Sequence, residues 1–463
     1  MFGYGIAMAG QGASYKFMGS YFIMFLTNCV MLDPAKASTI ASIALYVEAI
    51  MGMIIGNVSD SFVSKMGRRR PFILVSSIVM PIVLFLITHT IHNTETVEVI
   101  YYAILAILFR VSFSNFEIPY TAFGAEVAKD YDERTKLRTI TRAFGIIGNI
   151  VGYVVPIYVL GLFPDNEQEK AWQIVGAIVA ISVFIALFSG FMLTKGKGVI
   201  ITKDQVQKKK NVFVNIIKNY IELAKLKPMR LLVLYKACFG SALALYDVGM
   251  IYYLTCVLKL NNVKSSLTYT IQIAVFLVMT PIVNKMALAW GKAKQQVYTL
   301  AIGGILGILV FLIAPANVYI GVAYMCIFAV VQTGFWQISS SIFYDCVEVD
   351  EWVNYKRREG DIMSMVSVLG TLVTAIMVQL FGIFLKSSGY DGALAGNQAA
   401  STIGFLKVEY ILIPSILCLI AAFSVKLLPI TKTRFESLQK AIEARKNGEN
   451  YDEYMDDVNA IVK

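Results

Sequence analysis

The sequence has few of the residues with which soluble enzymes carry out chemistry. It contains only two histidines, both near the end of one apolar run, so a zinc hydrolase or a histidine proton relay lacks its parts. Its six cysteines lie in or at the ends of apolar runs without a CxxC pair, and we interpret them as small packing residues. Neither a phosphate-binding loop nor a G-x-S-x-G nucleophile motif occurs. We therefore expect no enzymatic activity, no resident cofactor and no metal site.

Charge is scarce as well. Charged residues make up 16% of the chain and hydrophobic residues 57%, against roughly 25% charged residues in an average soluble domain. The net charge of +10 would suggest nucleic-acid binding in a soluble protein, but here Lys and Arg lie between long apolar runs, where they orient membrane spans. The composition predicts a membrane protein and no nucleic-acid partner. A cleavable signal peptide is not expected, because Met1 leads into an apolar run without a basic segment.

The apolar runs are long enough to cross a bilayer. A crossing takes about 20 apolar residues, and by this measure the sequence predicts an all-α protein with twelve transmembrane helices. Their approximate ranges are 4–31, 36–59, 71–91, 97–121, 138–163, 171–194, 229–257, 264–290, 296–315, 318–343, 360–385 and 403–428.

The basic residues predict how these spans are oriented. The even-numbered loops carry 23 Lys and Arg, whereas the odd-numbered loops carry 5. Because basic loops remain on the cytoplasmic side, we expect the even loops and both termini to be cytoplasmic, in an inner cell membrane. The longest loop divides the spans six and six. It predicts an N-terminal bundle, a central cytoplasmic loop, a C-terminal bundle and a cytoplasmic tail, at 1–194, 195–228, 229–428 and 429–463.

A weak repeat supports two related bundles. Asp60 precedes Gly67 by seven residues after the second span, and Asn284 precedes Gly291 by seven residues after the eighth; each glycine is followed by a basic residue. Such repeats predict a substrate site at mid-depth between the two halves. The charged tail is expected to form a short amphipathic helix followed by disorder.

Several charged residues lie inside the predicted spans, where each is costly and is normally explained by a function or by a partner. The deep ones are Lys16, Glu48, Arg110, Glu117, Arg142, Lys236 and Asp247. Arg110, Ser114 and Glu117 follow at i, i+4 and i+7, so they share one helix face. Two interpretations remain open: a static ion-pair network, or charges in a water-filled cavity that exchange partners with substrate or protons. The charges nearer span ends are interpreted as interfacial anchors, namely Lys285, Lys407 and Glu409.

Polar residues in the seventh and tenth spans are further candidates for a substrate site. Asp247 lies in the seventh span with no cation adjacent in sequence. Trp336 lies inside the tenth span, with Gln332 one turn before it and Gln337 beside it. An aromatic ring in this position can stack on the apolar face of a sugar while amides bond its hydroxyls. A packed core tryptophan is the alternative.

Four stretches of the sequence carry a family resemblance. The first lies in the first span and includes Tyr4-Gly5, Gly10 and Thr27-Asn28. The other three are Met66 to Phe72, Glu117 to Tyr120, and Asp345 to Gly360. Together they resemble the glycoside–pentoside–hexuronide cation symporters, the branch of the major facilitator superfamily that includes the melibiose permease. The likeness covers about residues 4–428. It implies two six-helix bundles that rock about a central site, and the import of a sugar, glycoside or sugar acid with a coupling cation.

The resemblance also implies roles for single residues. Glu117 lies where the family has an acid that bonds sugar hydroxyls, and Arg142 matches an arginine near the same site. Trp336 matches the family tryptophan of the opposite bundle. Glu48 takes the place of one of two second-helix acids that coordinate the coupling cation, and Ser114 keeps the fourth-helix hydroxyl.

The sequence departs from the family at several of these positions. The second cation-site acid is lost, together with the asparagine between the two acids, so sodium coupling is doubtful because sodium needs several oxygens. The sequence also lacks three further family residues: the first-helix acid that binds sugar, a fourth-helix aromatic and an eleventh-helix lysine. The replacing residues are Gly12, Met51, Gly52, Thr121 and Thr371. The chain instead adds Lys16 and Arg110 near these positions.

Two transport mechanisms follow from these departures. In the first, which we favour, Glu48 binds and releases a proton during the cycle, giving proton symport. In the second, the Arg110 guanidinium occupies the vacated cation position, pairs with Glu48, and leaves a uniporter without a coupling ion. Lys16 and Arg142 favour an anionic substrate such as a hexuronide over a neutral glycoside.

Charged residues beside the even loops predict a cytoplasmic gate. Asp60 and Arg68 follow the second span, and Asp345 and Arg358 follow the tenth. Salt bridges between these two groups would close the gate, with a solvated basic loop as the alternative. Two rival functions stay open: a lipid or amphiphile transporter of the same fold, and a non-transporting membrane sensor. We expect a small sugar as substrate, the lipid bilayer as surroundings, and a monomer.

Overall fold

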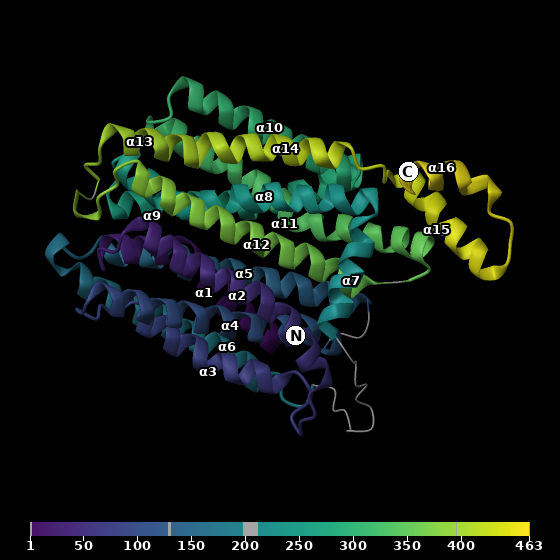
Figure 1. Cartoon of the computed structure of the whole chain (residues 1–463), viewed down its shortest axis with the longest axis horizontal. Coiled ribbons are helices and arrows are strands. Elements are labelled where there is room, and N and C mark those ends of the chain that lie inside the picture. Colours follow the sequence, from purple (N-terminus) through teal and green to yellow (C-terminus); the bar gives the residue numbers. More distant parts are fainter. Residues whose placement is uncertain (1, 128–130, 198–211, 357, 395, 463) are drawn as a thin grey trace. The chain divides into compact units, whose positions relative to one another are not determined.

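The computed structural model describes residues 2–127, 131–197, 212–356, 358–394 and 396–462 (Figure 1). Within these ranges the regular elements are helices. The long ones of the first half are α1 (Phe2–Asn28), α2 (Pro34–Ser61), α3 (Arg70–Ile87), α4 (Glu95–Val127), α5 (Tyr131–Leu160) and α6 (Gln168–Leu193). Those that follow are α7 (Val212–Ala224), α8 (Lys227–Tyr252), α9 (Asn262–Trp290), α10 (Lys292–Ile313), α11 (Val318–Asn354), α12 (Glu359–Ser387), α13 (Ala400–Lys407), α14 (Ile413–Lys426), α15 (Lys432–Asn447) and α16 (Met455–Val462).

Two π-helical segments interrupt the regular hydrogen bonding. Segment η3 (Tyr253–Val257) extends α8, and η5 (Val408–Leu412) joins α13 to α14 into one continuous helix. Short 3₁₀ turns lie outside the long helices, namely η1 (Asp165–Glu167), η4 (Gly392–Leu394) and η6 (Asp452–Tyr454).

The predicted all-α membrane architecture is confirmed. Eleven helical stretches in the described chain are long and apolar enough to cross a membrane. The first predicted span is also a helix, α1, but it is not among these eleven. Polar residues such as Gln11, Ser14 and Lys16, together with many glycines, lower its hydropathy. Polar groups are retained in a membrane helix when neighbouring helices cover them, as they do here.

The chain folds into two compact units. Unit 1 comprises Met1–Lys209, Ala244–Ile273 and Ala375–Tyr410. Unit 2 comprises Lys210–Leu243, Ala274–Thr374 and Ile411–Lys463. The sequence placed one boundary in the loop 195–228, whereas the boundary between the units also passes through α8, α9 and α12. Parts of these helices contact the first half directly: Asp247 of α8 bonds Lys16 of α1, Tyr269 of α9 stacks on Tyr153 of α5, and Gly382 of α12 packs on Ser38 of α2.

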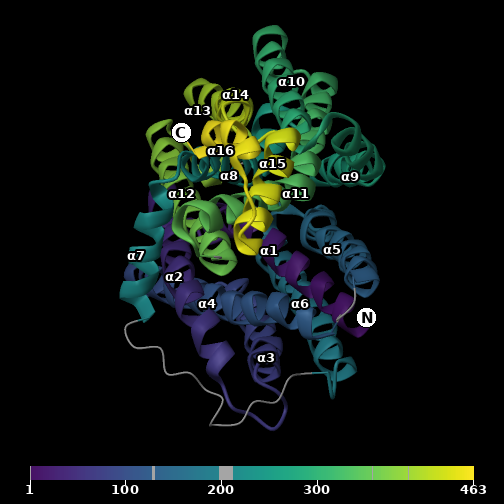
Figure 2. The ribbon, with the colours of Figure 1, turned by 90° about the vertical axis from the view of Figure 1, so that its right-hand side faces the viewer.

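In unit 1, α1 lies between α5 and α6 (Figure 2). Glycines allow this close approach. A Cβ atom at Gly148 or Gly152 of α5 would lie 2.2 or 2.5 Å from the carbonyl oxygens of Ala9 and Ala13 in α1. Small residues spaced four apart are typical of tightly packed membrane helices. This interface fixes the position of Lys16, which lies less than one turn after Ala13 on α1.

In unit 2, α10 packs against α11 and α14, and glycines again allow the close approach. A Cβ atom at Gly307 of α10 would lie 2.0 Å from the Ser415 hydroxyl oxygen of α14. This packing holds the helices that carry Trp336 and its neighbours.

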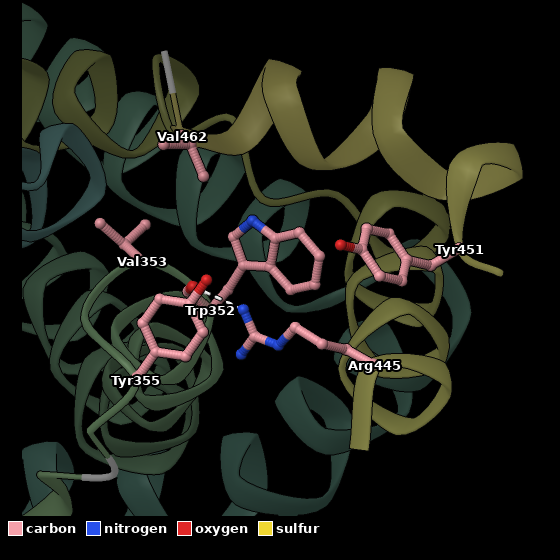
Figure 3. A pocket seen from close by; sticks show the side chains of 6 residues that line it. All are labelled: Trp352, Val353, Tyr355, Arg445, Tyr451 and Val462. Atoms are coloured by element: carbon pink, nitrogen blue, oxygen red, sulfur yellow. Dashed lines mark hydrogen bonds between the residues drawn. The ribbon is translucent and has the colours of Figure 1, made fainter. Parts of the chain in front are cut away.

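The tail docks on the end of α11. The Arg445 guanidinium of α15 lies 4.3 Å from the centroid of the Trp352 ring and 4.4 Å from that of Tyr355 (Figure 3). It also donates hydrogen bonds to the carbonyl oxygens of Trp352 and Glu351. Lys446 pairs with the Glu351 carboxylate at 2.6 Å. The expectation of disorder after one helix is therefore wrong for residues 433–462, because cation–π contacts and backbone acceptors order this segment.

Candidate functional site

Glu48 of α2 and Arg110 of α4 form a buried ion pair. The Arg110 Nη1 donates to Glu48 Oε2 at 3.0 Å, and the side chains are only 9% and 13% exposed for Arg110 and Glu48. Ser114 is buried one turn after Arg110 on the same face of α4. The structure thus brings together the three residues predicted for cation or proton coupling. Their role in coupling stays a prediction.

A second buried ion pair joins α1 to α8. Lys16 Nζ donates to Asp247 Oδ2 at 3.0 Å, and both side chains are largely buried. Tyr153 of α5 completes the group: its hydroxyl accepts from Lys16 at 3.1 Å and donates to Asp247 Oδ1. The Lys16 ammonium also lies 4.8 Å from the centroid of the Tyr153 ring. Three helices therefore meet at one charged, hydrogen-bonded group.

The two pairs belong to one electrostatic neighbourhood in unit 1. The Tyr15 hydroxyl lies within electrostatic range of members of both pairs and of the predicted sugar-binding acid, namely Asp247, Arg110, Glu48 and Glu117. Glu117 is half-buried on α4. We call Lys16, Glu48, Arg110, Glu117 and Asp247 the charged cluster. The sequence predicted all five of these residues and, in the uniporter alternative, the pairing of Arg110 with Glu48, but it did not predict the pairing of Lys16 with Asp247.

Arg142 lies near the start of α5 and is exposed. It precedes Tyr153 by eleven residues, or about three helical turns, so both residues share one face of α5. The α1 helix approaches this face closely at Gly12, where a Cβ atom would lie 3.1 Å from the Gly145 carbonyl oxygen. Any side chain at position 12 would press against the α5 backbone, so glycine suits this close approach.

Trp336 and Gln337 lie on α11 in unit 2 with a lysine beside them. Trp336 is 45% exposed. The Lys236 ammonium of α8 lies 5.2 Å from the centroid of the Trp336 ring and 4.8 Å from that of Phe335. Gln337 Oε1 is buried without a hydrogen-bond partner among the described residues. The arrangement offers an aromatic surface, a cation and a free amide oxygen.

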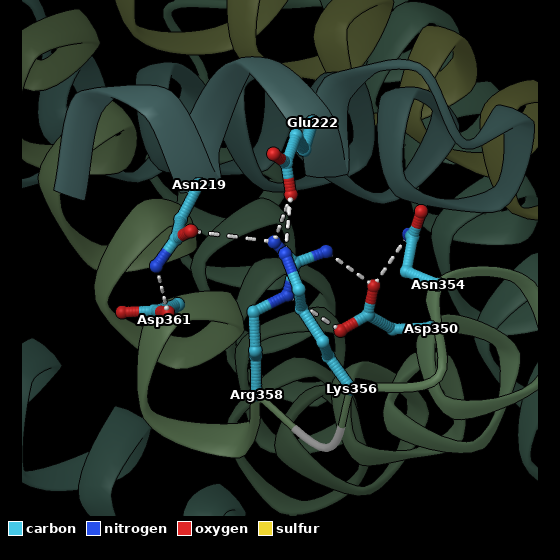
Figure 4. A network of polar contacts seen from close by, with 7 residues as sticks. All are labelled: Asn219, Glu222, Asp350, Asn354, Lys356, Arg358 and Asp361. Carbon is cyan, nitrogen blue, oxygen red and sulfur yellow. Dashed lines mark hydrogen bonds and ion pairs between the residues drawn. The ribbon is translucent and has the colours of Figure 1, made fainter. Parts of the chain in front are cut away.

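The predicted gate residues have partners inside unit 2. Asp345 of α11 pairs with Lys292 of α10 at 2.9 Å. Arg358 bonds Asp350 at 2.6 Å and Glu222 at 2.7 Å, so α7 is fastened to the loop between α11 and α12 (Figure 4). Lys356 also bonds Glu222, and Asn219 bonds Asp361. Arg68 lies in the segment after α2, and the Asp60 side chain lies outside the described part of the chain. Bridges between the bundles stay a prediction.

Hydrogen bonds set the ionisation of this gate network. Those from Arg358 and Lys356 hold the pKa of Glu222 below its ordinary value. The hydrogen bonds that Arg358 donates to Asp350 raise the pKa of its guanidinium, with Glu222 contributing. Both shifts favour the charged forms of Glu222 and Arg358 and thus the ion pair between them.

Sequence analysis missed several residues of these groups. Tyr153 is one tyrosine in an apolar run, and nothing in the pattern separates it from a packing residue. Glu222 lies on a short amphipathic helix that no span prediction detects. Glu409 was interpreted as an interfacial anchor, and this is wrong: it is 1% exposed and packed against Gly249 of α8.

The surroundings of Glu48 are those at which the sequence predicts that sodium coupling is lost. At Gly52, where the family has its second acid, an added Cβ atom would face the Ile118 methyl group at 3.6 Å. One oxygen of Glu48 already accepts from Arg110. In the described chain, no group of three or more His, Cys, Asp or Glu residues is placed to hold a metal ion. Glu48 and Ser114 supply fewer side-chain oxygens than a hard cation usually takes, and the loss of sodium coupling stays a prediction.

Comparisons with known proteins show which family and which fold the chain resembles. A family model described as MFS/sugar transport protein matches residues 3–432. An isoprimeverose transporter of Lactiplantibacillus pentosus is 22% identical, over 89% of this chain and 85% of its own. A glucuronide carrier protein homolog of Escherichia coli is 21% identical, over 96% of this chain and 95% of its own. The solved structure of a D-xylose-proton symporter covers 94% of this chain and 97% of its own with a TM-score of 0.67 at 14% identity, which shows a shared fold.

Proposed function

The chain belongs to the MFS/sugar transport family and is a secondary transporter of sugars in a membrane, and we propose that it imports a sugar, glycoside or sugar acid together with a proton. The resemblance to the glycoside–pentoside–hexuronide symporters is thereby confirmed, and an enzymatic function is excluded by the family. The coupling ion, the class of sugar and the orientation in the membrane belong to the proposal.

The Glu48–Arg110 pair is the observation that carries the proton proposal. A carboxylate that is bonded to a guanidinium in a buried site has two stable states. Either Glu48 is ionised and paired with Arg110, or it is protonated and Arg110 is released. In the first step a proton from water forms an O–H bond on Glu48. The freed guanidinium then becomes available to an oxygen-rich substrate, and loss of the proton restores the pair.

The basic residues of the site support an anionic or oxygen-rich substrate. Lys16 and Arg142 lie on α1 and α5, and Lys236 lies beside Trp336. A ring with a cation beside it suits a sugar acid, because the ring covers the apolar face and the cation binds the carboxylate. The glucuronide carrier homolog among the relatives is consistent with this choice. If neutral disaccharides competed better than glucuronides for uptake, we would abandon the anionic substrate.

The uniporter is the second candidate, and the same ion pair favours it. A guanidinium held at 3.0 Å from Glu48 can replace a coupling cation permanently. In that case Arg110 never leaves Glu48, and uptake follows the sugar gradient alone. The lipid transporter gains less support: an apolar groove of about 750 Å³ is lined by residues of α9, α10 and α11, such as Met279, Trp290 and Val331, and not by Lys16 or Arg142.

We also propose the orientation and the gate that the sequence predicted. Both termini and the tail lie in the cytoplasm, and the protein works as a monomer in the inner cell membrane. The network around Arg358 then lies on the cytoplasmic side. In another conformation, Asp345 and Arg358 exchange their present partners for Asp60 and Arg68 and close the gate.

Uptake into proteoliposomes tests the proposal. The probes are labelled glycosides, hexuronates and a lysophospholipid, each with and without an inward proton gradient and with and without sodium. We expect sugar uptake that the proton gradient stimulates and that sodium does not change. Sugar uptake indifferent to the gradient would establish the uniporter. Movement of the lysophospholipid without sugar uptake, or no flux at all, would contradict both.

A further inference from the structure

Glu409 is a buried acid that the transport scheme above leaves without a role. It lies in η5 and is 1% exposed. Among the described residues, neither of its carboxylate oxygens has a hydrogen-bond partner. Glu48 and Asp247 are buried as well, but a cation holds each of them. Glu409 thus differs from Glu48 and Asp247, two of the three acids of the charged cluster.

The helix backbone leaves room for this carboxyl group. A Cβ atom at Gly249 of α8 would lie 2.2 Å from Glu409 Oε2 and 2.7 Å from Oε1. Any side chain at position 249 would therefore displace the carboxyl group. Glu409 also lies within a π-helical turn, and such turns occur frequently at functional sites.

Tyrosine rings cover the turn that carries Glu409. Tyr410 stacks on Tyr246 of α8 with the ring centroids 4.9 Å apart. It also stacks on Tyr253 of η3 at 4.4 Å. These rings exclude water from the turn, and tyrosine hydroxyls carry no positive charge that could stabilise a carboxylate.

The remaining titratable groups nearby supply no counter-charge either. Tyr252 lies within electrostatic range of Glu409, and Cys256 lies one turn further along η3. Both groups are neutral in their ordinary form. Lys407 precedes Glu409 by two residues, which places it about 200° away around the helix axis. In the described chain it forms no ion pair with Glu409.

An ionised carboxylate without hydrogen bonds or a cation is strongly disfavoured in a protein interior. We therefore propose that Glu409 is a second proton-binding site of the transporter, holding a proton in this conformation and releasing it to water when α8 moves away. On release the O–H bond of the carboxyl group breaks, the proton passes to water, and the carboxylate remains. The coupling role rests on the proposed function, whereas the bound proton does not.

The α8 helix links this site to the charged cluster. Asp247 and Gly249 are two residues apart, so they point about 200° apart around the axis of α8. On one side Asp247 is held by Lys16 and Tyr153. On the other side Gly249 packs on Glu409. A rotation of α8 about its own axis breaks the Lys16–Asp247 pair and at the same time turns Gly249 away from Glu409.

Infrared spectroscopy tests the bound proton directly. The difference spectrum between wild type and Glu409→Gln, both in lipid, is expected to contain the C=O stretch of a neutral carboxylic acid, shifted in D₂O. The control Glu436→Gln removes an exposed carboxyl group of the tail and is expected to remove carboxylate bands instead. If Glu409→Gln also removed only carboxylate bands, the proposal would be overturned.

Transport tests the release of the proton. Glutamine imitates the protonated state, so Glu409→Gln is expected to keep the exchange of labelled sugar between equal concentrations. It is expected to lose the accumulation that an inward proton gradient drives. Accumulation equal to that of wild type would overturn the coupling role. If wild type itself showed no proton-driven accumulation, the proposed function would fail, and the infrared band alone would decide whether Glu409 holds a proton.

A variant that keeps the carboxyl group guards against misfolding of Glu409→Gln. Gly249→Ala is expected to displace the Glu409 carboxyl group, shift its infrared band and weaken accumulation. The matched control is Gly404→Ala on α13, where an added Cβ atom meets open space, and wild-type behaviour is expected. An unshifted band in Gly249→Ala would contradict the described packing around Glu409.

Discussion

The two ion pairs of unit 1 differ in the helices that they join. Glu48 and Arg110 connect α2 to α4, which are neighbours in the first half of the sequence. Lys16 and Asp247 connect α1 to α8 of the second half, and Tyr153 bonds both. The first pair is therefore suited to hold or exchange a proton within a bundle. The second is suited to sense substrate, because it must break whenever α1 and α8 separate.

Removing Arg110 should leave a buried charge. Arg110→Ala is expected to lower the free energy of unfolding by about 3–5 kcal/mol, because Glu48 loses its partner. The double variant Glu48→Gln/Arg110→Ala should regain most of that loss. Thermal unfolding in detergent measures both effects. If the single variant were as stable as wild type, the pair would not be buried as described.

Removing Lys16 should weaken substrate binding. Lys16→Met is expected to raise the KM for a hexuronate about tenfold or more, the effect of one lost charged hydrogen bond, and to affect neutral glycosides less. The matched control is Lys36→Met, whose pair with Glu95 is half-exposed and contributes little. Initial rates of uptake provide the measurement. An equal change for both substrate classes would show that Lys16 supports the fold and does not read the charge of the substrate.

At the scale of helices, glycines determine how closely α1 and α5 approach. Gly148→Ala places a Cβ atom 2.2 Å from the Ala9 carbonyl oxygen. We expect this variant to lose about 1–3 kcal/mol of stability through overpacking. Gly19→Ala on α1 is the control, because an added Cβ atom meets nothing there and alanine favours a helix. A melting temperature of Gly148→Ala equal to that of the control would contradict the described interface.

The docking of α7 should depend on pH. The hydrogen bonds from Arg358 and Lys356 lower the pKa of Glu222 in the docked state. At any pH above the ordinary pKa of glutamate, this carboxylate is ionised and stabilises docking in full. The stabilisation is lost as the pH falls through the lowered pKa of the docked state. Distances between spin labels on α7 and α11 should therefore broaden at acid pH in wild type.

Two variants complete this test of α7. Glu222→Gln should show the broad distances already at neutral pH. Lys356→Gln should resemble wild type, because that lysine is mostly exposed and Arg358 remains bonded to Glu222. Unchanged distances in Glu222→Gln at every pH would show that other contacts hold α7.

The sequence predicted the long helices because a bilayer crossing requires about 20 consecutive apolar residues. Such a run can be recognised from the local sequence without knowledge of its neighbours. The sequence did not predict α7, α15 or α16 as docked elements, because short helices depend on partners such as Arg358 and Trp352 that lie far away in sequence. The π-helical turn at Glu409 was missed for a related reason. Its residues are those of an ordinary span, and only the packing of Gly249 and the tyrosine rings determines the burial of the acid.

Within the candidate site, composition identified the charged residues and packing decided their partners. Each of Lys16, Glu48, Arg110 and Asp247 stood out as a charge in an apolar run. The Arg110–Glu48 pair was predicted only through the family resemblance, as one of two alternatives. The Lys16–Asp247 pair depends on how α1 and α8 pack, which periodicity does not contain. The substrate cannot be named from the same residues, because a cation beside an aromatic ring suits many sugars.

At the scale of the whole molecule, interactions between the sequence halves inside unit 1 gather near the predicted odd-numbered loops. Asp33 pairs with Lys386 at 2.8 Å, and Asn28 accepts from the Tyr390 hydroxyl at 2.6 Å. Ser38 lies so close to Gly382 that an added Cβ atom would be 2.0 Å from its hydroxyl oxygen. With the proposed orientation, these interactions lie on the extracellular side of unit 1. In the proposed import cycle they would break and form again.

The central claim is that sugar and proton move together, and the pH inside proteoliposomes tests it most directly. A pH-sensitive dye is enclosed, the outer and inner pH are equal, sodium is absent, and a transported sugar is added outside. We predict that the interior becomes acidic as the sugar enters and that a protonophore abolishes the change. Sugar entry with no change of internal pH would contradict proton symport and establish the uniporter with Arg110 as its fixed counter-charge.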